Sequence, residues 1–307
     1  MAFKKFSLGA FGVALTANEY EAGLHLSMGG AFWKKFARRV KEKRVAAAAA
    51  ALRAGGVAAA QPGRTPEEAA LIERAGKIEW YHTIDLGNGI RTQGRFDHAP
   101  ILAEYQLPET FAGMRVLDVA TFDGFWAFEF EKRGAKEVYA LDLDSSRSLD
   151  WPPKRLASFT PEELAKPYGG GFALAKEALG SKVQRIVCNV YDLDPERFGF
   201  FDVVHSGDVL LHLNSPVKAL QNIARVCTNY ALISDVYFPE LDQMGGRKLC
   251  EYMGGRDNPT WWRMSLASLE AMILDAGFSR IERLSTFTYG YRAVSGRWQH
   301  AVIKAFK

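Results

Sequence analysis

The stretch from Val116 to Asp144 constrains the fold of this chain more than any other and reads VLDVATFDGFWAFEFEKRGAKEVYALDLD. Its apolar start is typical of a buried parallel strand. A turn at 121–124 then leads into a helix that ends at Gly134, and a second short strand delivers Asp142. This order is typical of a nucleoside-binding βαβ unit, because the glycine turn lets backbone approach the ligand and the acid accepts hydrogen bonds from ribose hydroxyls.

Helical and strand patterns alternate along the rest of the chain. Thr65-Pro66-Glu67-Glu68 is the capping box of a helix, and Gly87-Asn88-Gly89 is a turn between two short extended segments. Further helices are expected at about 100–105, 172–179, 215–226 and 265–276, and further strands at 183–187, 201–205, 230–236, 279–284 and 299–305. We expect no regular structure at Trp151-Pro152-Pro153. The pattern predicts an α/β fold with a doubly wound, mostly parallel sheet.

The segment 116–135 resembles motif I of the class I S-adenosylmethionine (SAM) methyltransferases, and Asp142 falls where that family keeps its ribose-binding acid. The family's G-x-G-x-G is here Ala120-Thr121-Phe122-Asp123-Gly124, so only the last glycine remains. The resemblance implies a Rossmann-like sheet of seven strands with the last antiparallel, and SAM as the cofactor. It extends over roughly 80–304, because Gly277-Phe278 matches a late A-G-F segment of the family.

The resemblance also assigns cofactor-binding positions. Asp142 would hold the ribose, Asn189 and Val190 after the third strand would read the adenine, and the turn 120–124 would face the methionine part. The full predicted set is Trp80, Asp118, Ala120, Thr121, Phe122, Gly124, Asp142, Leu143, Asn189, Val190, Ser206 and Gly207. For Asn189 the alternative is a simple turn residue.

Two segments narrow the resemblance to one branch. WYHTIDLGNGIRTQG at 80–94 and SGDVLLHL at 206–213 are similar to segments of small-molecule and wobble-uridine tRNA methyltransferases. Placed as in that branch, Trp80, Tyr81 and His82 would cover the cofactor cleft as a lid. Alternatively, Trp80 and Tyr81 pack the preceding helix onto the sheet.

Three residues are candidates for proton removal from a methyl acceptor. A histidine near its ordinary pKa suits this role, so we single out His82 and His212, with Asp208 as orienter or second base. His205 lies within a strand and is expected to be a core histidine, whereas His98 and His300 are candidate substrate contacts. No grouping has the spacing of a metal site, so no metal is predicted.

The charge of the chain is uneven. Residues 1–64 carry a net +8 and the remaining residues a net −4, although the whole chain of 307 residues carries only +4. We expect three parts: a basic N-terminal extension with an Ala/Gly-rich linker at 1–64, with helical spacing at 32–40; a helical lid at 65–113; and the SAM-binding domain at 114–307. Three scattered cysteines and the lack of a long apolar run favour a cytoplasmic protein, and the extension could form a homodimer.

The acidic body favours a small-molecule acceptor, such as a natural product or another metabolite with a hydroxyl or amine, because binding a phosphate backbone requires several cations. The alternative is tRNA wobble-uridine modification with SAM or carboxy-SAM, in which the basic extension would contact RNA. A non-catalytic binding protein of the same fold and a nicotinamide oxidoreductase are two further alternatives. Phe122 argues against the last, because its ring would crowd a pyrophosphate.

Overall fold

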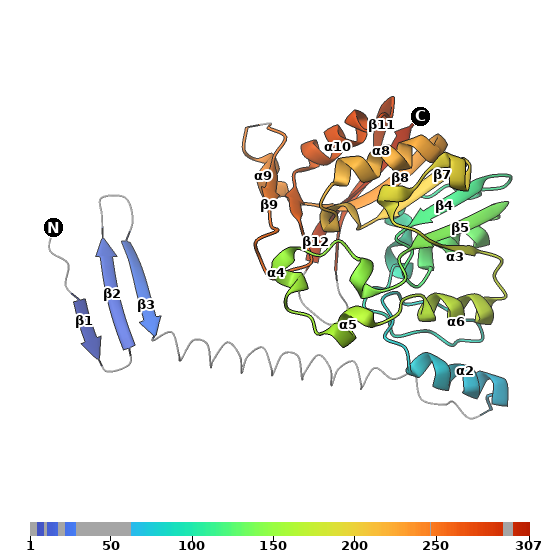
Figure 1. The fold of residues 1–307 in the computed structure, drawn as a ribbon, viewed down its shortest axis with the longest axis horizontal. Helices are drawn as coiled ribbons and strands as arrows, with labels where there is room; N and C mark the ends of the chain where they lie inside the picture. Colours follow the sequence, from blue (N-terminus) through green and yellow to red (C-terminus); the bar gives the residue numbers. More distant parts are fainter. Residues whose placement is uncertain (1–4, 9–10, 18–21, 29–62, 246, 291–296) are drawn as a thin grey trace. The chain divides into compact units, whose positions relative to one another are not determined.

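The computed structural model describes residues 5–8, 11–17, 22–28, 63–245, 247–290 and 297–307 (Figure 1). The chain divides into two compact units, Met1–Gly56 and Val57–Lys307. In the first unit β1 (Lys5–Leu8), β2 (Phe11–Ala17) and β3 (Ala22–Met28) form an antiparallel sheet in that order. The sequence did not lead us to expect these strands. The helix expected at 32–40 lies outside the described residues.

A seven-stranded sheet forms the centre of the second unit, in the order β11-β12-β8-β7-β4-β5-β6. Its members are β4 (Arg115–Val119), β5 (Glu137–Asp142), β6 (Gln184–Val187), β7 (Phe201–Gly207), β8 (Cys227–Tyr237), β11 (Arg280–Gly290) and β12 (Arg297–Phe306). Neighbours from β8 to β6 pair in parallel, whereas β12 runs antiparallel to both β8 and β11. The predicted Rossmann-like sheet is therefore confirmed.

Apolar side chains cover both faces of this sheet. On β4, Leu117 and Val119 join one buried cluster while Val116 joins the other, as expected for a strand buried on both sides. Helices α8 (Pro216–Val226) and α10 (Leu266–Asp275) pack in the first cluster. The second cluster contains residues of α2 (Pro66–Gly76), α3 (Phe125–Lys132), α6 (Gly170–Leu179) and the 3₁₀ helix η1 (Ala99–Tyr105).

Local sequence signals explain several of these boundaries. Thr65 caps α2 with the predicted capping box, since its hydroxyl accepts the N–H of Glu68 and the Glu68 carboxylate accepts the N–H of Thr65. The turn at 87–89 is also present, with all three residues at positive φ, but single bridges rather than strands flank it. The strands expected near 279–284 and 299–305 are both longer in the structure, where they are β11 and β12.

The expectation of irregular structure at 151–153 holds for Trp151 and Pro152 but is wrong at Pro153. Helix α4 (Pro153–Leu156) begins at the second proline, because the first position of a helix needs no N–H donor. The short helices α5 (Pro161–Ala165), α7 (Pro195–Phe198) and α9 (Pro239–Asp242) likewise begin with proline. Two short strands that the sequence did not signal, β9 (Cys250–Tyr252) and β10 (Trp262–Met264), form a separate antiparallel pair.

Candidate active site

The turn after β4 has an unusual backbone. Ala120, Phe122 and Gly124 all have positive φ, at 60°, 50° and 93°. These are the three glycine positions of the motif, so two non-glycine residues keep the left-handed conformation that glycine adopts without strain. Gly124 cannot be replaced easily, because an added Cβ would lie 2.6 Å from the Phe128 ring and 2.7 Å from the Phe172 ring. The turn thus retains the shape of the motif without its sequence.

The carboxylate of Asp142 is hydrogen-bonded to this turn. It ends β5 and is 7% exposed. Its Oδ2 accepts the N–H of Phe122 at 2.6 Å and its Oδ1 accepts the N–H of Leu143 at 2.7 Å. Burial raises the pKa of Asp142 to about 6, and the two N–H donors oppose that rise. Each carboxylate oxygen has a second lone pair, so Asp142 can still accept hydrogen bonds from a ligand.

Strand β6, the third strand of this sheet along the chain, leads to Asn189 and Val190 at the same end of the sheet. The Asn189 Oδ1 accepts the N–H of Tyr191 at 3.0 Å and begins the short 3₁₀ helix η3 (Val190–Asp192). Val190 is buried, and its carbonyl accepts an N–H of the Asn222 amide at 3.1 Å. Asn189 therefore has the local turn role that the sequence also allowed, and its contact with adenine stays a prediction.

Asp123 is a site residue that the sequence did not single out. Its Oδ2 accepts the N–H of Tyr81 at 2.6 Å and that of His82 at 3.0 Å, so it ties the segment before β4 to the motif I turn. The ring of Tyr81 lies 4.6 Å from that of Phe122. Burial raises the pKa of Asp123 to about 6. The only signal for Asp123 in the sequence was the presence of an acid inside the degenerate glycine motif.

Trp80 lies in the core. It is 3% exposed, and its indole N–H donates to the carbonyl of Ala75 at 2.9 Å, near the end of α2. This contact favours the packing alternative for Trp80. Tyr81 and His82 are the members of this segment closest to the turn, through their backbone bonds to Asp123. A lid role for the segment stays a prediction.

The centre of the sheet contains a buried polar pair. The His205 Nδ1 on β7 lies 2.7 Å from the Asp118 Oδ1 on β4, and both residues are 1% exposed. The ring of His205 packs 4.9 Å from that of Trp126. His205 thus has the core position that its place in a strand predicted, and Asp118 directs one oxygen at it rather than leaving both for a ligand.

The buried Asp235 stabilises the turn that follows β7. Asp208 has a φ of 51° and donates its N–H to the carbonyl of Ser234 at 2.8 Å. The buried Asp235 on β8 accepts the N–H groups of Val209 at 3.1 Å and Leu210 at 2.8 Å, and also that of Val236 at 2.8 Å. Burial raises the pKa of Asp235 to about 7. These hydrogen bonds hold the backbone of Asp208 in its left-handed conformation.

More than half of the chain matches a known family. A family described as "Methyltransferase domain" matches residues 95–282. The chain belongs to the methyltransferase domain family. The protein is accordingly a SAM-dependent methyltransferase with SAM as its cofactor, as its motif I, sheet order and Asp142 indicate. No curated protein matches the chain significantly.

Solved structures share the fold of this methyltransferase. The N-terminal domain of EvdMO1, crystallised in the presence of SAH and D-fucose, is 19% identical with a TM-score of 0.56; the match covers 81% of this chain and 100% of that domain. The same domain with SAH bound gives a TM-score of 0.55 over the same shares. Full EvdMO1 gives 0.51 at 19% identity, and the match covers 80% of this chain but 49% of EvdMO1.

Buried polar atoms of the methyltransferase provide a test of whether SAM fits. Within 63–245, 247–290 and 297–307, several buried atoms near the carboxyl ends of the central strands have no hydrogen-bond partner. They include Asp118 Oδ2, Thr121 Oγ1, His205 Nε2, Ser206 Oγ and His82 Nδ1. Such atoms in a native protein usually face water or a ligand. Donors and acceptors on the neighbouring strands β7 and β4, with Asp142 at the end of the next strand β5, suit a cofactor with ribose, amino and carboxylate groups, so the residues fit SAM.

The predicted catalytic residues fall in two places. His82 lies 5.5 Å from His98 between ring centres, and burial holds the pKa of His82 well below its ordinary value. His212 belongs to η4 (Leu210–His212), just beyond Asp208, and its Nδ1 lies 2.8 Å from the Pro259 carbonyl. Burial also lowers the pKa of His212. Both are therefore neutral near pH 7.

Gly207 and Ser206 end β7 beside this turn. Ser206 is fully buried, and a Cβ at Gly207 would lie 3.1 Å from the His205 ring. A side chain at 207 would therefore require the buried ring of His205 to move by a few tenths of an ångström. In the part of the chain with described coordinates, no group of three or more His, Cys, Asp or Glu is placed to hold a metal ion.

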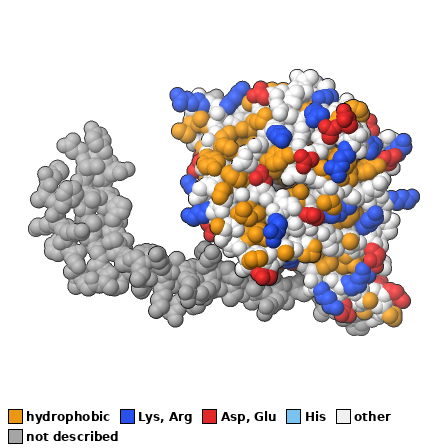
Figure 2. Space-filling model, in the orientation of Figure 1, with side chains coloured by type: hydrophobic (Ala, Val, Ile, Leu, Met, Phe, Trp, Pro, Cys, Tyr) orange, Lys and Arg blue, Asp and Glu red, His pale blue; other side chains and the backbone are white. Residues whose placement is uncertain are grey.

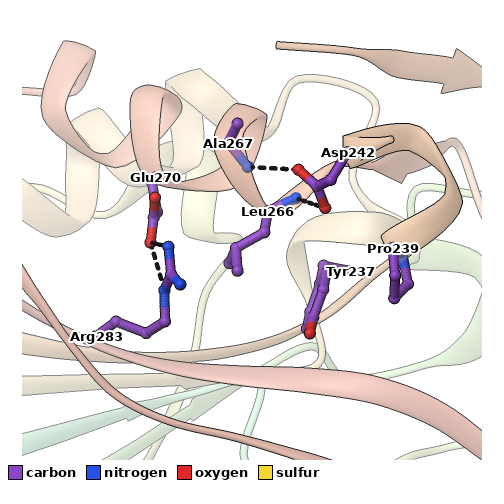
Figure 3. A pocket seen from close by; sticks show the side chains of 7 residues that line it. All are labelled: Tyr237, Pro239, Asp242, Leu266, Ala267, Glu270 and Arg283. Carbon is purple, nitrogen blue, oxygen red and sulfur yellow. Dashed lines mark hydrogen bonds and ion pairs between the residues drawn. The ribbon is translucent and has the colours of Figure 1, made fainter. Parts of the chain in front are cut away.

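One open pocket, of about 390 Å³, lies elsewhere (Figure 3). Its carboxylates are engaged within the protein: Asp242 accepts the N–H groups of Leu266 and Ala267 at the start of α10, and Glu270 pairs with Arg283. Both acids of this pocket therefore have structural roles, Asp242 at the start of α10 and Glu270 in the ion pair with Arg283.

Proposed function

We propose that this methyltransferase transfers the methyl group of SAM to a hydroxyl or amine of a small molecule, such as a natural product or another metabolite. The observation that carries the proposal is Asp208, a carboxylate held in a left-handed turn at the carboxyl end of β7, where ligands bind in open α/β sheets. After burial, the groups that shift its pKa most are the histidines His300, His98 and His212. This setting suits an acceptor without phosphates.

The chain's residues would divide the work as follows. Asp142 would accept the ribose hydroxyls, and Asn189 with Val190 would contact the adenine. SAM, when bound, supplies a methyl group on a positively charged sulfur, so the acceptor requires alignment and, if it is a hydroxyl, the loss of one proton. Asp208 would accept that proton, and the neutral His82 and His212 would accept hydrogen bonds from the acceptor.

Surface charge supports a small acceptor over RNA. On the face that Figure 2 shows, lysine and arginine side chains are interspersed with aspartate and glutamate rather than gathered in one patch. The tRNA alternative depends on the basic residues of 1–64, whose side chains, apart from that of Arg64, lie outside the described residues. A role of the wobble-uridine branch, the use of carboxy-SAM, dimerisation through the extension and a cytoplasmic location therefore stay predictions. No helix in the described parts of the chain is both long and apolar enough to span a membrane.

Transfer of a labelled methyl group tests the proposal. The purified chain is incubated with methyl-labelled SAM and either a panel of small hydroxyl and amine compounds or bulk tRNA. We expect label in small products, and we expect Asp208→Asn to reduce it at least tenfold without weakening SAH binding. Label in tRNA instead, lost when residues 1–64 are deleted, would contradict the small-molecule proposal.

A further inference from the structure

His300 lies in a setting that fixes its protons. It belongs to β12 and is 1% exposed. Its Nδ1 is 3.1 Å from the carbonyl oxygen of Trp298, and its Nε2 is 3.2 Å from the Oδ1 of Asp208. The ring of Phe287 stacks on it, with centres 5.4 Å apart and planes at 8°. The last strand of the sheet thus delivers an imidazole to the turn after β7.

The proton count follows from what each neighbour can do. A carbonyl oxygen only accepts hydrogen bonds, so the Nδ1 of His300 must carry a proton. The Asp208 Oδ1 has no hydrogen-bond partner, so its 3.2 Å contact with the His300 Nε2 is an ion pair, and an ion pair with an ionised Asp208 requires a second proton on Nε2. Both nitrogens then carry protons and the ring is a cation, which a stacked aromatic face such as that of Phe287 stabilises.

The other titratable groups around Asp208 do not supply this positive charge. Groups that interact with it from neighbouring elements are His98, Tyr105, His212, Asp235 and His300. Burial lowers the pKa of His98 to about 3, and the His98 Nδ1 lies 3.1 Å from the Tyr105 hydroxyl, so this pair is neutral. Asp235 is an acid. The pKa of His300 is raised, because the charge of Asp208 and the hydrogen bonds outweigh burial.

We infer that His300 is a permanent cation at neutral pH and a positioning residue for the proposed methyl-transfer site, where it holds Asp208 ionised and turned toward the acceptor. The inference rests on the proposed function only for its catalytic meaning. One Asp208 oxygen faces His300, which leaves the other to take the acceptor proton. When that proton arrives, the acceptor O–H bond breaks, Asp208 becomes neutral, and His300 keeps its charge.

This arrangement gives His300 a different role from His82 and His212. Those two side chains are neutral, and their pKa values are lowered by burial, so neither can compensate the charge of a buried carboxylate. A buried ionised acid without a compensating cation would instead take up a proton itself. Asp208 depends on His300 for that compensation, since the pKa of Asp208 is lowered mainly through the charge of His300, against the effect of burial.

Nitrogen-detected NMR of the full chain, labelled with ¹⁵N-histidine and without ligand, tests the inference. The imidazole signals are followed from pH 5 to 9, and His300→Gln identifies the signal of residue 300 by its loss. We expect both ring nitrogens of His300 to keep imidazolium shifts at pH 7.5. In Asp208→Asn the midpoint should fall by at least one pH unit, because the counter-charge is gone. Asp242→Asn, at the start of α10, is the control and should leave the midpoint unchanged.

A neutral His300 in the wild-type protein at pH 7.5 would overturn the inference, and so would an unchanged midpoint in Asp208→Asn. The wild-type titration decides the matter by itself if the variant does not fold. SAH binding, measured separately by calorimetry, distinguishes the two proposals: a protonated His300 in a chain that does not bind SAH would refute the proposed function and leave the ion pair standing.

Discussion

Replacing Ala120 with glycine tests whether the motif I turn stores backbone strain. Ala120 has a φ of 60°, a left-handed conformation that costs an L-residue roughly 1–2 kcal/mol. Glycine relieves this cost, but its freer unfolded chain costs about 0.4–1 kcal/mol, and loss of the half-buried Cβ costs at most about 0.8 kcal/mol. Mid-range values give a small net gain for Ala120→Gly, about 0.4 kcal/mol in the free energy of unfolding.

A matched control makes the test sharp. Ala70 is an exposed residue inside α2, where its backbone is ordinary helix. Ala70→Gly should lose about 0.5–1 kcal/mol, because glycine is less favourable than alanine in a helix interior. Urea unfolding followed by circular dichroism gives both values. Ala120→Gly should be the more stable of the two variants by about 1 kcal/mol. If Ala120→Gly loses as much stability as Ala70→Gly, the turn is not strained and this account of it is wrong.

Three further predictions concern buried acids. Asp123→Ala should lower the free energy of unfolding by about 2–4 kcal/mol, since it leaves the N–H groups of Tyr81 and His82 unpaired; Asp123→Asn, whose amide oxygen can accept both, should lose less than half of that in urea unfolding. The folded pKa of Asp235 is raised to about 7 from 3.8, so its contribution to stability falls as pH rises between these values. Asp235→Asn removes this dependence. From pH 5 to pH 8 the free energy of unfolding of the variant, relative to that of the wild type, should therefore rise by roughly 2–3 kcal/mol; no change over this interval would refute the raised pKa. Asp142 has a pKa of about 6, and its protonation turns one acceptor oxygen into a donor, so that the carboxyl can no longer accept from both N–H groups and both ribose hydroxyls. SAH affinity measured by calorimetry should therefore fall by up to about tenfold per unit below pH 6, and a constant affinity from pH 8 to 5 would contradict this.

The sequence predicted the sheet because its signals are local. Apolar runs marked the strands, Thr65 and Glu68 marked a helix start, and the position of Asp142 after its strand needed no tertiary information. The proline start of α4 was misjudged because Pro153 was taken only as a breaker, although its first-position role is equally local.

The rest of the site depends on contacts between distant residues. Asp208 and His300 meet only because β12 inserts next to β8, and nothing near either residue in the sequence signals this pairing. Asp123 binds the backbone of Tyr81, which any residue type could have provided. The left-handed φ of Phe122 was also hidden, because a non-glycine residue at that position suggested that the turn had changed. Side chains can be read from a sequence, but their partners across the sheet cannot.

Calorimetric titration of SAH into the wild-type chain and Asp142→Asn is the most direct test of a SAM site built on Asp142. Asparagine removes the charge and turns one acceptor into a donor facing the N–H of Phe122 or Leu143. We predict that the wild type binds and that Asp142→Asn binds about 5- to 150-fold more weakly, from a loss of about 1–3 kcal/mol. The control is Asp144→Asn, because Asp144 is exposed and its carboxylate accepts from the hydroxyls of Ser145 and Ser148; this variant should bind as the wild type does. No binding by the wild type, or equal affinity in Asp142→Asn, would contradict the account.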